Sequence, residues 1–153
     1  MMRRLTRIAV ALALALAMGT AGTAQAVVVI PLLILKSKRG GTIALAPVEI
    51  NGHRYLFVLD TGAEFSVIQT RVARSLHLKA FGKRIKSRGV GTGVGRFVRV
   101  NNWAVGPQPL PASIAVRENL KLPRQVGGLL GSDVLSRFGA FLINYANGTL
   151  TLP

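Results

Sequence analysis

Asp60, Thr61 and Gly62 are the residues whose types and order are best suited to chemistry. They follow a segment, 53–59, whose alternating side chains predict a strand. A carboxylate at the end of a strand can accept or donate a proton, and Gly62 lets a ligand or a backbone approach closely. The same tripeptide also forms ordinary turns after strands, so alone it leaves a catalytic and a structural interpretation open.

A second segment makes the catalytic interpretation stronger. Leu129, Leu130 and Gly131 lead into a segment, 134–138, that predicts one or two helical turns. Paired with the tripeptide at Asp60, this segment contributes to a family resemblance.

The remaining polar residues offer weaker candidates. Asp133 or Ser132 is predicted to cap the helix at 134–138, and no Thr-Gly follows Asp133, so it is not a second catalytic aspartate. His53 and His77 are isolated, and no nucleophile elbow is present for a hydrolase triad. The sequence has no cysteine, which excludes disulfides, and it has too few ligands for a metal site.

The elements that must position Asp60 are mostly short strands. Alternating or β-branched segments predict strands at 27–35, 42–50, 53–59, 65–68, 96–105, 113–116, 141–145 and 149–152. Asn51-Gly52 and Asn147-Gly148 predict two hairpin turns, and 69–78 predicts a helix. Many short strands with regular turns indicate an all-β sandwich or barrel.

Three segments in this order, 52–63, 89–95 and 129–135, resemble those of retropepsin-like aspartic proteases, most of all the bacterial single-domain members. The resemblance covers residues 42–152. It implies an all-β fold, a closed β-barrel with one or two short helices. It also implies an aspartic endopeptidase that cleaves peptide or protein substrates without a cofactor.

The resemblance assigns a role to each matching residue. The roles are catalysis for Asp60, a hydrogen bond across a twofold axis for Thr61, the cleft floor for Gly62 and Ala63, a brace under the loop for Leu130 and Gly131, and a substrate-covering flap for Gly91, Thr92 and Gly93. The glycine spacing at 89–95 fits neither dinucleotide nor Walker loops, which also favours a flap or a plain hairpin. Retroviral members pair an acid at the position of Glu64 with an arginine, and here Ser132 occupies the arginine position.

The mechanism of such enzymes requires two aspartates that share one proton. This chain supplies one Asp-Thr-Gly, so the resemblance implies a homodimer with an Asp60 from each copy. The alternative is a non-catalytic cationic β-barrel that binds partners in the cell envelope while Asp60 only holds a turn.

The N-terminus predicts export. Residues 1–26 combine three arginines, an apolar run and Ala24-Gln25-Ala26, which is typical of a secretory signal peptide. Cleavage would leave an apolar strand and basic turn at 27–41 and the protease domain at 42–153, in the periplasm or outside the cell. An uncleaved membrane anchor is the alternative.

The charge is strongly basic, with a formal net charge of +15, or +12 without residues 1–26. Such a field attracts polyanions, including acidic peptides and anionic envelope components. Few aromatic residues and no nucleic-acid-binding motif are present, so no nucleic-acid partner is expected. We expect acidic peptides to be captured preferentially by the basic residues around the predicted flap.

Overall fold

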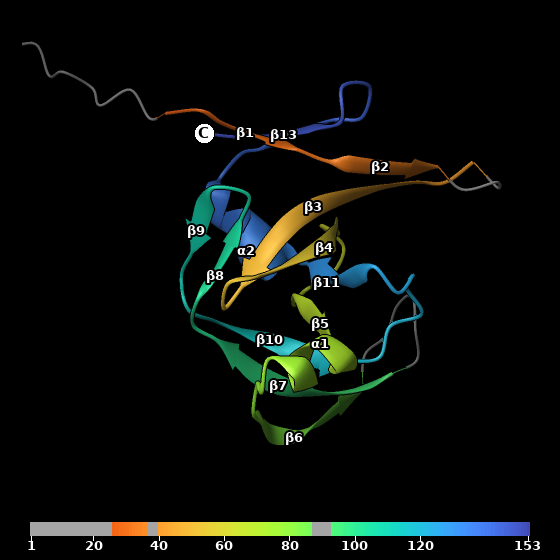
Figure 1. Cartoon of the computed structure of the whole chain (residues 1–153), viewed down its shortest axis with the longest axis vertical. Helices are drawn as coiled ribbons and strands as arrows, with labels where there is room; N and C mark the ends of the chain where they lie inside the picture. The colour runs from red at the N-terminus through yellow and green to blue at the C-terminus, as the bar shows by residue number, and fades with distance from the viewer. Residues whose placement is uncertain (1–25, 37–39, 87–92) are drawn as a thin grey trace, which may run out of the picture.

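The protein was analysed as a computed structural model, which describes residues 26–36, 40–86 and 93–153. These residues form an all-β fold with short helices (Figure 1). The strands are β1 (Val28–Pro31), β2 (Leu33–Lys36), β3 (Thr42–Ile50), β4 (His53–Leu59), β5 (Val67–Gln69), β6 (Ala80–Lys86), β7 (Val94–Val100), β8 (Trp103–Val105), β9 (Gln108–Leu110), β10 (Ser113–Glu118), β11 (Val126–Leu130), β12 (Leu142–Asn144) and β13 (Thr149–Leu152). The helices are α1 (Thr70–Ser75) and α2 (Ser132–Leu135), and a 3-10 turn, η1, covers Ser136–Phe138.

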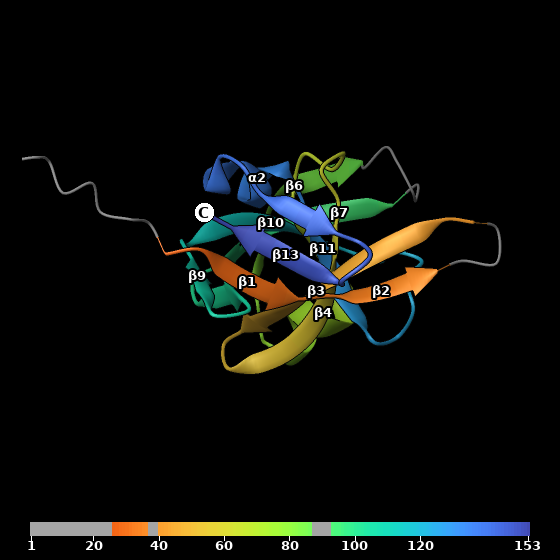
Figure 2. The same cartoon turned by 90° about the horizontal axis from the view of Figure 1, so that it is seen from above.

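The strands form two sheets. The large sheet has ten strands in the order β6-β7-β10-β5-β11-β4-β3-β8-β9, with β2 paired to β3 beside this path. The small sheet has the order β1-β13-β12 and lies along one side of the large sheet (Figures 1 and 2). Because β1 continues into β2, the first strands of the described chain connect the two sheets.

The predicted closed barrel is wrong, because neither sheet closes on itself. A barrel requires the two edge strands of a sheet to pair with each other. The edges of the large sheet are β6 and β9, and these are not hydrogen-bonded to one another. Pro109 lies within β9, and Pro107 and Pro111 flank it, so this edge lacks N–H groups that a further strand would need.

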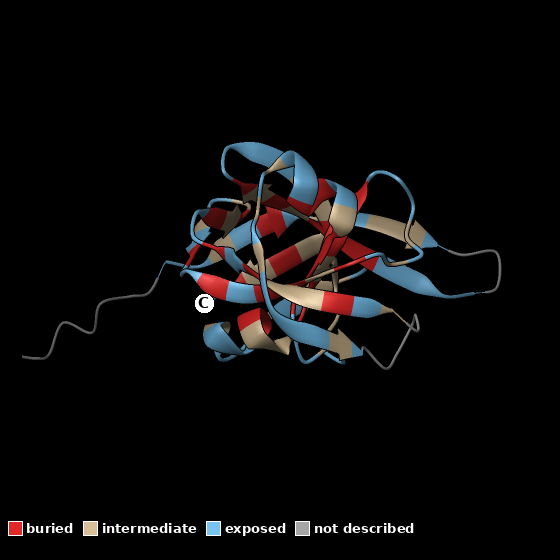
Figure 3. Cartoon of the chain, turned by 90° about the horizontal axis from the view of Figure 1, so that it is seen from below, coloured by how far each residue is buried: buried red, intermediate tan, exposed pale blue. Residues whose placement is uncertain are grey.

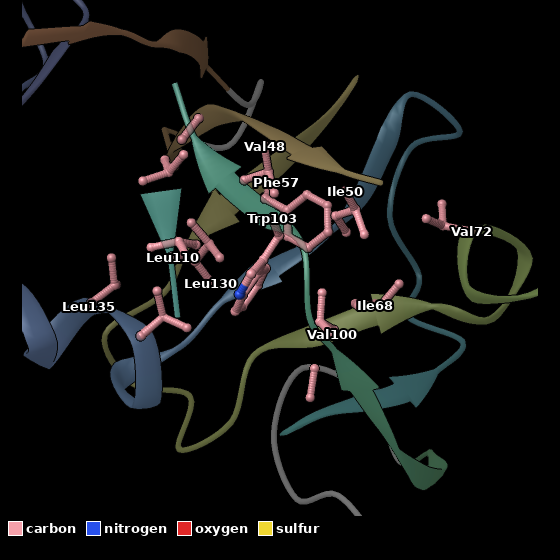
Figure 4. Packing of buried hydrophobic residues seen from close by; sticks show 14 of the residues in the cluster. Val48, Ile50, Phe57, Ile68, Val72, Val100, Trp103, Leu110, Leu130 and Leu135 are labelled. Carbon is pink, nitrogen blue, oxygen red and sulfur yellow. The ribbon is translucent and has the colours of Figure 1, made fainter. Parts of the chain in front are cut away.

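The core is built by strand alternation, mostly in the large sheet, with further side chains from the helices and the small sheet. Val48 and Ile50 of β3 and Phe57 of β4 are buried on one face of the large sheet (Figure 4). Ile30 and Leu150 add buried side chains from the small sheet. Figure 3 shows the buried residues through the middle of the molecule and the exposed ones toward its outer loops and strand ends. One continuous core therefore holds both sheets.

Several elements differ from the sequence prediction in their bounds. The predicted strand 27–35 is two strands in different sheets, and the predicted strand 96–105 is broken into β7 and β8. The predicted helix 69–78 is shorter, because His77 has a positive φ of 53° and turns the chain after α1. The turn at Asn51-Gly52 forms as predicted, with positive φ at both residues.

No helix of the described residues has the length and apolar character needed to cross a membrane.

Candidate active site

Asp60 lies where the parallel strands β4 and β11 end together. Leu59 is in register with Leu130, and the Asp60 N–H donates to the Leu130 carbonyl at 3.0 Å. The register between β4 and β11 shifts at Gly127, between the pairs Val126/Leu56 and Gly128/Phe57. Backbone hydrogen bonds therefore hold the chain against β11 as far as Asp60, the residue that carries the carboxylate.

The Asp60 side chain is held by its own loop. Its Oδ1 accepts a hydrogen bond from the Gly62 N–H at 3.0 Å, and the Asp60 carbonyl accepts one from the Ala63 N–H at 3.2 Å. A Cβ at Gly62 would lie 3.3 Å from Oδ1, so a side chain there would crowd the carboxylate. Asp60 is half-buried, whereas Thr61 and Gly62 are exposed. The carboxylate is oriented, and the loop beside it is open.

Ser66 and Asp133 form a second support that the sequence did not reveal. The Ser66 N–H and hydroxyl both donate to Asp133 Oδ1, at 2.9 and 2.8 Å. The Ser66 hydroxyl oxygen accepts from the Gly131 N–H at 3.0 Å. Ser66 is fully buried, and these four groups join the segment after Asp60 to the start of α2. We call these contacts the serine brace.

The prediction that Asp133 or Ser132 caps the helix is wrong. The N-cap of α2 is Gly131, and no side chain caps it. Asp133 contacts Ser66 instead, and the Ser132 N–H and hydroxyl donate to the Ala63 carbonyl at 2.8 and 3.0 Å. Ser66 and Asp133 are 67 residues apart in sequence, so their contact depends on the fold of the chain.

Ser132 replaces the retroviral arginine with a different contact. It binds the backbone of the loop rather than an acidic side chain, and Glu64 is exposed. Ser132 therefore supports the loop by donating hydrogen bonds to its backbone carbonyls, and the Glu64 side chain remains exposed to solvent.

Two glycines of β11 and its end allow this close packing. A Cβ at Gly131 would lie 2.7 Å from the backbone carbon of Phe65 and 2.8 Å from the Ala63 carbonyl oxygen. A Cβ at Gly128 would overlap the Val67 carbonyl. Residues larger than glycine would force β11 away from the segment that follows Asp60.

An apolar row crosses the large sheet next to Asp60. Its members are register partners on adjacent strands: Phe81, Phe97, Val116, Val67, Leu129 and Val58, from β6 to β4. Residues that pair in register share a face of the sheet, and this face is opposite the one that carries Phe57 and Ile68 into the core. Val58 precedes Asp60 by two residues, so the row leads up to the carboxylate.

The flap prediction is only partly within the described residues. Gly91 and Thr92 lie outside them, whereas Gly93 stands just before β7, which pairs with β6 as a hairpin. A Cβ at Gly93 would overlap the Glu118 carboxylate, which is buried at the end of β10. Glu118 is a residue near the predicted flap that the sequence analysis did not single out.

Of the other predicted site residues, Ala63 and Leu130 both lie at the Asp60 loop, with Ala63 half-buried and Leu130 buried. In residues 26–36, 40–86 and 93–153, no cluster of three or more His, Asp or Glu side chains could hold a metal ion.

Comparison with known proteins identifies the family. Residues 46–134, more than half of the chain, match the family model described as "Aspartyl protease". The chain belongs to the aspartyl protease family. The matched stretch includes both the Asp60 loop and the serine brace, and the predicted resemblance to retropepsin-like proteases is confirmed.

The curated relatives are longer proteins. The chain is 35% identical over 98 residues to DNA damage-inducible protein 1 of Chaetomium globosum, covering 61% of this chain and 21% of that protein. It is 38% identical over 97 residues to the protein of the same name from Candida glabrata, covering 60% and 21%. The chain thus spans about a fifth of the length of the curated relatives it matches.

Among solved structures, the chain is similar to a retropepsin-like aspartic protease from Rickettsia conorii. The TM-score is 0.56 and the identity 20%, over 83% of this chain and 89% of that one. At this identity the likeness shows a shared fold.

Proposed function

We propose that the protein is an aspartic endopeptidase whose active site contains Asp60 from each of two copies. The observation that carries this proposal is the Asp60 loop, which orients one carboxylate through Gly62 and is anchored to Leu130. Membership of the aspartyl protease family supports the same chemistry.

No other acid of the printed sequence is available beside Asp60, which supports a second carboxylate from another copy. Asp133 is engaged in the serine brace, and Glu49 pairs with Arg54. Glu118 is buried at the end of β10, and Glu64 is exposed in solvent. The exposed Thr61 and Gly62 leave the side of the loop open to a twofold-related copy.

The reaction needs one proton on the pair of aspartates. The ionised Asp60 takes a proton from a bound water, and the water oxygen bonds to the scissile carbonyl carbon. The protonated Asp60 of the other copy donates a hydrogen bond to the carbonyl oxygen. The intermediate then breaks its C–N bond, and the leaving nitrogen takes a proton from the pair. Water supplies every atom that is added, so no cofactor is required.

The apolar row supports a preference for substrates with apolar side chains close to the scissile bond. Val58 and Leu129 are half-buried beside the Asp60 loop, and an apolar side chain placed on them would lose contact with water. The expected capture of acidic peptides around the flap rests on exposed cations such as Lys83 and Arg84 of β6 and stays a prediction. We assign the positions next to the bond to apolar residues because Val58 and Leu129 lie there.

The remaining roles follow from this proposal. Thr61 bonds across the dimer axis, Gly62 and Ala63 form the cleft floor, and Leu130 and Gly131 brace the loop. Gly93, with Gly91 and Thr92 outside the described residues, belongs to the flap.

Export is part of the proposal. Residues 1–25 lie outside the described residues, and β1 begins at Val28, just after the predicted cleavage site. Intact-mass measurement on protein from its native cells should give a chain that begins at Val27. A chain that keeps Met1 would indicate an anchor instead.

Asp60→Asn tests the proposed function. The variant should keep its fold and lose all cleavage of a peptide library, because the amide cannot exchange the proton. Glu64→Gln is the matched control, since it removes an exposed carboxylate from the same loop and should leave cleavage intact. Full cleavage by Asp60→Asn would contradict the proposal and favour the non-catalytic binding protein.

A further inference from the structure

A shallow depression of about 380 Å³ lies at the end of β4 that is far from Asp60. Three arginines from three different elements line it: Arg54 of β4, Arg71 of α1 and Arg124 of the loop before β11. Tyr55 and Gln125 add polar groups, and Leu56 and Pro47 add apolar surface. We call this feature the arginine depression.

The strand topology gives its position relative to the active site. β4 and β11 are parallel, with Leu56 in register with Val126 and Leu59 with Leu130. The strands therefore begin at the arginine depression and end at Asp60. Strands rise roughly 3.3 Å per residue, so Tyr55 and Asp60 are separated by about 17 Å.

Arg71 and Arg124 form no ion pair with a carboxylate of the described residues, and the ion pair that Arg54 forms is exposed. Arg54 is ion-paired to Glu49, with Nε and Oε2 3.5 Å apart and side chains 87% and 44% exposed. Pairs this exposed are weak and exchange readily with other anions. Arg71 Nη2 donates to the Val126 carbonyl at 2.6 Å, which fixes that guanidinium at the wall of the depression. A positive, partly preorganised surface remains, and the carboxylate that faces it among the described residues is the exposed Glu49.

Guanidinium groups bind carboxylates through paired, charge-assisted hydrogen bonds. We propose that the arginine depression binds an acidic segment of the protein substrate, some distance from the bond that is cut. This inference rests on the proposed peptidase function. An extended peptide spans roughly 3.4 Å per residue, so about five residues separate the acidic segment from the scissile bond.

This placement reconciles two features of the chain. Apolar residues of the substrate contact the apolar row beside Asp60, whereas acidic residues contact Arg71 and Arg124 farther away. The strong positive charge of the chain then contributes to substrate selection without placing a cation in the catalytic site.

The test is direct binding to the full chain carrying Asp60→Asn, which holds peptide without cutting it. One fluorescent peptide carries an apolar segment, a five-residue Gly-Ser spacer and four glutamates, and its partner carries four glutamines instead. Fluorescence anisotropy at low salt should show the glutamate peptide binding about tenfold more tightly, with the advantage shrinking as salt rises.

Added substitutions localise the effect. Arg71→Gln with Arg124→Gln should remove the advantage, and Arg124→Gln alone should reduce it, which guards against a folding defect from the lost Arg71–Val126 bond. Lys36→Gln, which removes an exposed cation of β2 outside both the arginine depression and the predicted flap, is the matched control for Arg124→Gln and should keep the full advantage.

The inference is overturned by a preference for the glutamate peptide that survives the arginine substitutions, or by one that the control variant loses equally. Competition by a single-stranded oligonucleotide as strong as by the glutamate peptide would also overturn it, since the surface would then bind any polyanion. Cleavage of the glutamine peptide by the wild type tests the proposed function separately. Equal cleavage of both peptides by the wild type would support the peptidase function and would contradict a role of the arginine depression in substrate binding.

Discussion

The two ends of the β4–β11 pair are built very differently. At the Asp60 end, the backbone of the loop is bonded to Leu130 and Ser132, and the serine brace holds the next residues. At the other end, Arg54 and Arg124 are exposed, and Arg71 has one hydrogen bond to a carbonyl. Proton transfer needs atoms placed to within a few tenths of an ångström, whereas recognition of a flexible acidic segment tolerates moving side chains. One strand pair can therefore serve both tasks only if its ends differ in rigidity.

The largest expected effect comes from a substitution that forces β11 away from β5. Gly128→Ala places a Cβ onto the Val67 carbonyl, so β11 must separate from β5, and we expect a loss of about 3 kcal/mol or more in the free energy of unfolding. Urea denaturation measures this loss. Gly62→Ala is the comparison, since its Cβ meets only Asp60 Oδ1 at 3.3 Å; it should lower activity far more than stability. If Gly128→Ala lowers the free energy of unfolding as little as Gly62→Ala, β11 is not packed tightly against β5.

The serine brace gives the next effect. Asp133→Ala leaves the buried N–H and hydroxyl of Ser66 without their acceptor and should cost about 1–3 kcal/mol of stability. Asp133→Asn keeps an acceptor oxygen and should lose less. We also expect kcat to fall more than KM rises, because the Asp60 loop loses its support. Unchanged stability and kcat in both variants would exclude the brace as a positioning element.

Thr61→Ala probes the dimer rather than the monomer. The side chain is exposed in the single chain, so monomer stability should hardly change. If the hydroxyl bonds across the twofold axis, the dimer dissociation constant should rise roughly tenfold, the cost of a lost buried hydrogen bond. Sedimentation over a range of concentrations measures the shift. A wild-type dissociation constant for the Thr61→Ala dimer would show that the Thr61 hydroxyl does not stabilise the interface.

The smallest effect is expected at the arginine depression. Glu49→Gln breaks the ion pair with Arg54, and the exposure of this pair limits the stability change to less than about 0.5 kcal/mol. Because Arg54 then loses its internal partner, binding of the glutamate peptide should strengthen slightly. Thermal unfolding and anisotropy check both results. A large drop in stability would show that this end is as rigid as the Asp60 end.

The sequence predicted those parts of the fold that local patterns control. Asn51-Gly52 places a hairpin directly before the strand that carries Asp60, and the apolar alternation of 53–59 gives β4. The closed barrel was wrong because closure depends on how distant edge strands meet, which no local sequence pattern shows.

Asp60, Leu130 and Gly131 stay predicted site residues, whereas the contact between Ser66 and Asp133 was not predicted. Asp60 and Gly131 carry recognisable motifs, whereas Ser66 is an ordinary residue between Phe65 and Val67. Its contact with Asp133 arises because β5 and β11 are neighbours in the sheet, which no local pattern shows. The arginine depression was missed for the same reason, since its arginines come from three separate elements.

The central claim, one catalytic Asp60 from each of two chains, is tested most directly by mixing. A fixed amount of wild type is incubated with a roughly tenfold excess of Asp60→Asn, at a concentration where both dimerise, and peptide cleavage is measured after exchange. Most wild-type chains then pair with the variant, so activity should fall to about a tenth. Activity that stays unchanged, while sedimentation of differently tagged chains shows mixed dimers, would contradict a shared pair of aspartates.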